Sequence, residues 1–140
     1  MFGTYQHSDL RIEIEASADK ISESLTEPER LEQWLWPQQV KFSSGNGEVN
    51  NWSASSTSVG KLSVGQEFES ALGLAKIGHR VEQISPYGVR FLLSGSIDGF
   101  HEWQWGDGWV QSRLEGISLL PLNLGQTLSL LRLKQYLQQS

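Results

Sequence analysis

The stretch GFHEWQWGDGWVQSRLEG, residues 99–116, contains the strongest local folding signal in the sequence. The dipeptide Asp107-Gly108 is typical of a two-residue turn between two antiparallel strands. With that turn, Trp105 lies opposite Val110, and every second residue outward from this pair faces the same side. The stretch therefore predicts a β-hairpin that gathers tryptophans on one face.

The loop length decides which residues share a face. A two-residue turn puts Glu102 opposite Arg113 on a polar face, as an exposed ion pair, whereas a three-residue loop would mix polar and apolar residues. The hairpin before it keeps the same inner face if residues 97–99 form a three-residue loop with Gly99 in the left-handed conformation. The predicted inner face is then Phe91, Leu93, His101, Trp103, Trp105, Val110 and Leu114.

The segments before this region predict a strand, two short helices and a meander. DLRIEIEAS, residues 9–17, alternates apolar and charged residues as a half-buried strand does. Ser17 is placed to cap a short amphipathic helix, and TEPERLEQWL at 26–35 begins a second helix with capping-box spacing between Thr26 and Glu29. From Gln66 onward, strands and turns alternate as in an antiparallel meander.

Two segments leave alternatives open. Residues 43–60 are rich in Ser, Asn and Gly, and they contain either a strand near 48–53 or a loop, with Trp52 on the outer surface or over a pocket. The C-terminal segment 122–140 favours a helix with two apolar stripes, which indicates packing between two layers. The sequence does not tell the two stripes apart: they are Leu124, Leu128 and Leu131, and Leu130, Leu133 and Leu137.

Composition excludes several classes of function. The 140-residue chain has no cysteine, so disulfides, thiolate metal sites and thiol nucleophiles are excluded. The net charge of −5 and the scattered basic residues argue against nucleic acid as a partner. No segment is apolar enough to span a membrane, and residues 1–17 lack the pattern of a signal peptide. We therefore expect a single cytoplasmic domain over residues 1–140.

The sequence contains no recognised catalytic or metal-binding motif. His7, His79 and His101 do not share the spacing of metal ligands, and neither a nucleophile elbow nor a phosphate-binding loop occurs. We expect no metal and no cofactor, and no catalytic residue is assigned. A histidine over an apolar pocket more often orients a ligand than catalyses a reaction.

Three motifs resemble the START-like superfamily, also called SRPBCC, whose members include polyketide cyclases and lipid-transfer domains. IEIEASADKISESLTEPERLEQWLWP resembles its opening strand and helices, VGQEF at 64–68 a later strand start, and VEQISPYGVRF a hairpin. The resemblance covers nearly the whole chain. It implies an α+β helix-grip fold, in which a curved antiparallel sheet wraps around the C-terminal helix and two short helices follow the first strand.

The resemblance also implies an internal cavity, and this leads to three hypotheses. The first is non-enzymatic binding or transport of a small hydrophobic molecule, such as a lipid, an isoprenoid or a polyketide-like compound. The alternatives are a cyclase or dehydratase acting on such a molecule, and a regulatory module that binds a protein. The predicted cavity residues are Phe91, Leu93, His101, Trp103, Trp105, Ser112, Leu114, Leu124, Leu128 and Leu131.

Overall fold

In the part of the chain that the structure describes, one antiparallel sheet of seven strands forms the framework, in the order β1-β7-β6-β5-β4-β3-β2. The computed structural model describes residues 3–34, 39–42, 62–72 and 75–138. The strands are β1 (Thr4–Glu13), β2 (Gln39–Phe42), β3 (Glu67–Leu72), β4 (Ala75–Ser85), β5 (Gly88–Gly95), β6 (Ile97–Gly106) and β7 (Trp109–Ser118). The helices are α1 (Ala18–Thr26), α2 (Pro28–Trp34) and α4 (Leu122–Gln138).

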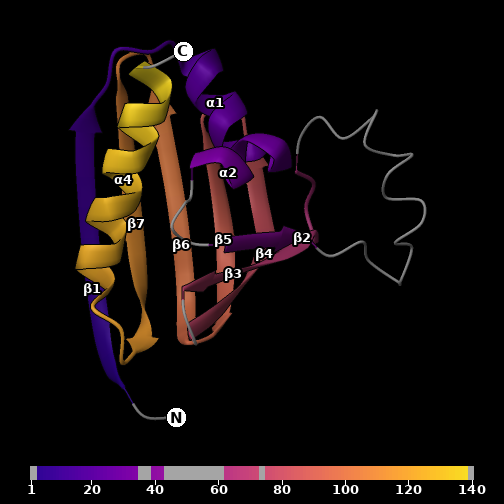
Figure 1. The fold of residues 1–140 in the computed structure, drawn as a ribbon, viewed down its shortest axis with the longest axis vertical. Helices are drawn as coiled ribbons and strands as arrows, with labels where there is room; N and C mark the ends of the chain where they lie inside the picture. The colour runs from indigo at the N-terminus through magenta and orange to yellow at the C-terminus, as the bar shows by residue number, and fades with distance from the viewer. Residues whose placement is uncertain (1–2, 35–38, 43–61, 73–74, 139–140) are drawn as a thin grey trace.

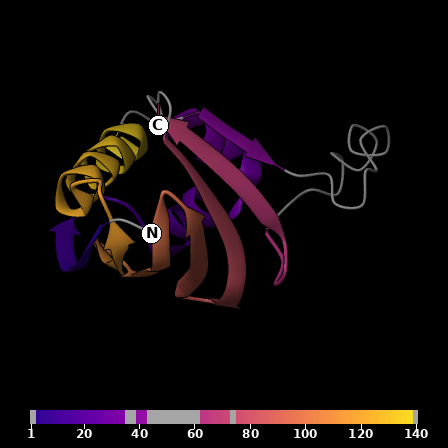
Figure 2. The same cartoon turned by 90° about the horizontal axis from the view of Figure 1, so that it is seen from below.

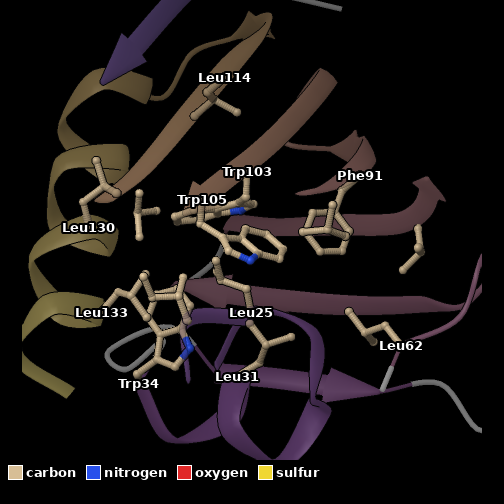
Figure 3. Close-up of a cluster of buried hydrophobic side chains, with 14 of the residues drawn as sticks. Leu25, Leu31, Trp34, Leu62, Phe91, Trp103, Trp105, Leu114, Leu130 and Leu133 are labelled. Carbon is tan, nitrogen blue, oxygen red and sulfur yellow. The ribbon is translucent and has the colours of Figure 1, made fainter. Parts of the chain in front are cut away.

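The sheet is curved, and the helices lie on its concave side. Figure 1 shows α4 running along β1 and β7, with α1 and α2 in front of the central strands. In Figure 2 the strands form a bent wall that rises away from α4 toward β3. The core fills the space between these layers, and Figure 3 shows tryptophans of β6 facing leucines of α1, α2 and α4. The predicted helix-grip architecture is confirmed.

The first helices form where the sequence predicted them, except for one cap. Ser17 Oγ accepts a hydrogen bond from the Lys20 amide at 3.3 Å, as an N-cap does. Pro28 is the first residue of α2, where its missing N–H costs little. The capping box is wrong, because Thr26 closes α1 and donates its hydroxyl to the Ser22 carbonyl at 2.6 Å instead.

The β6–β7 hairpin has the predicted register. Trp105 pairs with Val110 across a turn in which Gly108 has a φ of +85°. Glu102 pairs with Arg113 in register, but the expected ion pair between them does not form. The Glu102 carboxylate lies 3.9 Å from Arg90 instead, and the Arg113 guanidinium lies 3.0 Å from Glu115.

The turn between β5 and β6 lies nearer the N-terminus than predicted. The left-handed residue is Gly95, with a φ of +81°, and Ser96 follows it in the turn. Gly99 lies inside β6 opposite Leu93, so its proposed left-handed conformation is wrong. Because the shift moves the pairing by an even number of residues, Phe91 still faces the concave side, as predicted.

Helix α4 buries one of its two apolar stripes. Leu130, Leu133 and Leu137 are at most 5% exposed, and Gln126 continues this stripe one turn earlier. The other stripe faces outward, with about half of each leucine side chain exposed: Leu124, Leu128 and Leu131. The sequence could not tell the two stripes apart, because both consist of leucines.

One prediction concerns residues that the structure does not describe, and one strand was not predicted. The alternatives for residues 43–60, with Trp52, concern residues that lie outside the described part of the chain. Strand β2, at the edge of the sheet beside β3, was not predicted.

Candidate ligand cavity

A cavity of about 230 Å³ lies between the concave face of the sheet and the first half of α4. Strands β3 to β7 supply one wall, and α2, α4 and the residues before α4 supply the other. No Lys, Arg, Asp or Glu side chain lines it among the described residues. The lining residues are Leu31, Trp34, Phe68, Ala75, Ile77, His79, Phe91, Leu93, Ile97, His101, Trp103, Leu114, Leu120, Pro121, Leu122, Leu124, Gly125, Gln126, Leu128 and Ser129.

The structure separates the predicted cavity residues into two groups. Seven of the ten line the cavity: Phe91, Leu93, His101, Trp103, Leu114, Leu124 and Leu128. Trp105 and Ser112 are fully buried and do not line the cavity, and Leu131 is 54% exposed and does not line it either. The cavity lies beside the first half of α4, so Leu124 and Leu128 line it, whereas Leu131 of the same stripe lies one turn further along the helix.

The two central tryptophans therefore have different surroundings. Trp103 stacks at an angle on His101, with ring centroids 4.6 Å apart, and meets the edge of Trp34 at 6.0 Å. Trp105 is 1% exposed, and its indole N–H has no hydrogen-bond partner among the described residues. Figure 3 shows both indoles in the core between the sheet and the helices. Trp103 is the one placed to contact a molecule in the cavity.

Two histidines, on β4 and β6, place their imidazole rings on the cavity wall. His79 on β4 stacks on Phe68 at 4.5 Å, and its Nε2 lies 2.9 Å from the hydroxyl of Ser70, a buried residue. His101 on β6 places its Nε2 2.6 Å from the Ser112 hydroxyl. Both point inward because their strand positions alternate with outward-facing residues.

Both histidines are neutral at physiological pH. Burial lowers the pKa of His79 to about 4, because the charged imidazolium loses its hydration. Burial also lowers the pKa of His101 to about 3, with a smaller contribution from repulsion by His79. The walls therefore carry hydrogen-bonding groups without net charge.

Gln126 is a cavity residue that was not predicted from the sequence. Its side-chain nitrogen donates to the Ser112 carbonyl at 2.7 Å and lies 3.2 Å from the Ser8 carbonyl, while its side-chain oxygen accepts from the Ser8 hydroxyl at 2.5 Å. These bonds tie α4 to both β1 and β7. The signal was its position four residues before Leu130 in the buried stripe, where a polar residue needs a partner.

The structure also bears on metals and membranes. Among the described residues, no group of three His, Asp or Glu side chains is close enough to hold a metal ion. None of the described helices has the length and apolar character needed to cross a membrane.

The comparisons with known proteins identify the fold. No protein-family model and no curated protein matches the sequence. The solution structure of the Aha1 dimer from Colwellia psychrerythraea is similar to this chain, with 20% sequence identity and a TM-score of 0.62. The alignment covers 94% of this chain and 96% of the Aha1 chain. CalU16 from Micromonospora echinospora is 16% identical with a TM-score of 0.63, over 95% of this chain and 76% of that one.

A third structure extends the likeness to a longer protein. DynU16, from the dynemicin biosynthetic locus, is 16% identical with a TM-score of 0.64, and the alignment covers 94% of this chain but 47% of DynU16. At sequence identities of 20% or less, these comparisons show only that the fold is the same. The shared fold agrees with the curved sheet, the two short helices and the C-terminal helix described above. The chain therefore has a helix-grip fold, the fold that the resemblance to the START-like, or SRPBCC, superfamily implied.

Proposed function

We propose that the protein binds a small hydrophobic molecule in the cavity between the sheet and α4, without catalysing a reaction on it. The observation that carries this proposal is the cavity itself, with its apolar walls and two neutral histidines. Ligand pockets commonly combine apolar walls with a few polar groups that fix orientation. A dry cavity of about 150 Å³ is known to hold benzene, so about 230 Å³ suits a ligand somewhat larger than one ring.

The low basicity of the histidines favours binding over catalysis. A general base works best when its pKa lies near the working pH. His101, with a pKa of about 3, is a poor proton acceptor at neutral pH. This supports a role as a polar handle over the alternative of a cyclase or dehydratase that uses this residue as its base.

Blocking the cavity is expected to abolish binding. In Leu93→Trp the larger side chain enters the cavity, so the affinity for a two-ring ketone such as 2-acetylnaphthalene should fall by about 100-fold or more. Leu92→Trp is the matched control, because Leu92 is the next residue of β5 and points to the exposed face. Isothermal titration calorimetry measures both affinities, and native mass spectrometry of the purified variants detects any co-purifying ligand. Equal affinities in the two variants would contradict the proposal.

Protein interaction is a second candidate function, favoured by the outward stripe of α4. Leu124, Leu128 and Leu131 form a row on an exposed helix face, and such rows often mark contact surfaces. One structure with the same fold is described as a dimer. We propose that a second copy of the chain covers this face.

The interaction hypothesis has its own test at Leu131, which does not line the cavity. Leu131→Glu should weaken self-association at least tenfold, because it puts a charge into the apolar contact. Tyr87→Glu, at an exposed position in the β4–β5 turn, is the control. Sedimentation equilibrium measures the dissociation constants, and a wild-type protein that stays monomeric at about 100 μM would reject this candidate.

A further inference from the structure

A buried hydrogen-bond network fixes the orientation of the Gln126 amide. Its side-chain nitrogen faces two backbone carbonyls, those of Ser112 at 2.7 Å and Ser8 at 3.2 Å. Carbonyl oxygens only accept hydrogen bonds, so the group that faces them must be the NH₂ of the amide. The same nitrogen lies 3.0 Å from the Ser112 hydroxyl. Gln126 therefore presents a donor to Ser112.

The direction of the Ser112 hydroxyl follows from this. Ser112 is completely buried, and its Oγ has two partners among the described residues, Gln126 and His101. Because the NH₂ group of Gln126 cannot accept a hydrogen bond, the hydroxyl proton has one acceptor left, which is Nε2 of His101 at 2.6 Å. The reverse arrangement would leave a buried hydroxyl proton without an acceptor, which is costly.

The tautomer of His101 is thereby determined. A neutral imidazole has one protonated and one unprotonated nitrogen, so an accepting Nε2 places the proton on Nδ1. Nδ1 of His101 makes no hydrogen bond to any described residue. The Nδ1 atom of His79 is fully buried without a hydrogen-bond partner, whereas Nδ1 of His101 is not fully buried. The His101 ring lines the cavity, and its Nδ1–H is a donor without a partner among the described residues.

We propose that the cavity selects uncharged carbonyl compounds, whose oxygen accepts a hydrogen bond from Nδ1–H of His101. This inference rests on the proposed binding function and specifies its ligand class. An unused neutral donor calls for an acceptor, and a ketone, ester or amide carbonyl supplies one without adding charge. Carboxylates are disfavoured, because no cationic side chain of the described residues lines the cavity to offset the loss of their hydration.

The tautomer is tested on the ligand-free protein. Long-range ¹H–¹⁵N correlation spectra distinguish protonated from unprotonated ring nitrogens. We expect the Nδ1 signal of His101 in the protonated range and its Nε2 signal in the unprotonated range. Ser112→Ala removes the donor to Nε2, so the other tautomer should gain population in that variant. A wild-type spectrum with the proton on Nε2 would overturn the inference, whatever the protein binds.

Ligand selectivity is tested with three probes of similar shape: 2-acetylnaphthalene, 2-ethylnaphthalene and 2-naphthoate. His101→Phe should weaken binding of the ketone about tenfold and leave the ethyl compound within about twofold, because only the ketone loses a hydrogen bond. His7→Phe, on the exposed side of β1, is the control and should change neither affinity. The carboxylate should bind the wild-type protein at least about 100-fold more weakly than the ketone at neutral pH.

The possible failures of this experiment are distinguishable. If all three probes fail to bind, the proposed function is rejected, and the ligand class falls with it. If the ketone and the ethyl compound bind and lose the same affinity in His101→Phe, the cavity binds ligands but the carbonyl selection is wrong. Tight binding of the carboxylate would also overturn the selection while leaving the binding function in place.

Discussion

Lowering the pH from about 8 to about 5 is expected to reduce the free energy of unfolding by about 4 kcal/mol, or about 2 kcal/mol for each of His79 and His101. In the unfolded chain both histidines bind a proton below the ordinary histidine pKa of 6.5. In the folded protein they stay neutral until the pH approaches their lowered pKa values of about 4 and about 3.

The sign of the effect follows from this difference in bound protons. Above about pH 6.5 the folded and unfolded states bind the same number of protons at these sites, so the histidines cause no loss of stability there. As the pH falls below that value, the unfolded state gains protons that the folded state cannot take up. Stability therefore decreases until the pH reaches the folded pKa values, and the loss from the histidines then levels off.

Urea unfolding at a series of pH values measures this dependence. His101→Phe should remove about half of the decrease between pH 8 and 5, and the double variant with His79→Phe should remove most of it. His7→Phe is the control, since His7 is half exposed on β1. A decrease of the same size in the double variant would show that these two histidines are not its source.

Gly99→Ala is expected to destabilise the protein by about 3 kcal/mol or more, although alanine normally suits a strand better than glycine. A Cβ at this position would lie 1.9 Å from the Glu115 carbonyl oxygen and 2.5 Å from the Cα of Gly116. Both atoms belong to the backbone of β7, which is held on its other side by β1. Relief therefore requires the paired strands to separate.

Gly106→Ala is the matched control for this substitution. Gly106 is in the same strand, and neither glycine has a positive φ. An added Cβ at Gly106 would meet the side chain of Trp109, at 2.5 Å from its Nε1, and this contact is relieved by a shift of a side chain and not of a backbone strand. We expect this variant to stay within about 1 kcal/mol of the wild type, as measured by thermal and urea unfolding.

Gly99→Asn separates the steric explanation from the left-handed turn that was predicted from the sequence. Asparagine tolerates the left-handed conformation, so a turn position would accept it at small cost. Because the backbone of β7 lies against Gly99, we expect Gly99→Asn to lower the free energy of unfolding at least as much as Gly99→Ala does. A stability near that of the wild type for Gly99→Asn would contradict the steric explanation.

Two features of the sheet were predictable: the register that a turn sequence sets, and the faces that alternating apolar and polar residues occupy. Asp107-Gly108 set the β6–β7 register correctly, because a two-residue turn leaves little freedom in pairing. The position of the β5–β6 turn was wrong, because Gly95 and Gly99 are both plausible turn residues. The error left the faces intact, since side chains change faces only when the pairing shifts by an odd number of residues.

The candidate cavity was only partly predictable. Its sheet wall follows from the alternation along β5 and β6, which places Phe91 and Trp103 on the concave side. Its helix wall depends on how α4 is rotated about its axis, and the two leucine stripes are equivalent in composition. Gln126 was missed because its position four residues before Leu130 indicates burial only after the buried stripe of α4 has been identified.

The sequence alone was enough to predict the first strand with the two short helices after it, the β6–β7 register and the inward faces of the central strands, because these depend on residues close together in the chain. Which face of α4 is buried became known only from contacts between distant parts of the chain. The bonds of Gln126 to Ser8 and Ser112 join residues 118 and 14 positions apart, on β1 and β7. A buried amide must be paired, so this contact selects the rotation of the helix, and with it the position of the cavity and the tautomer of His101.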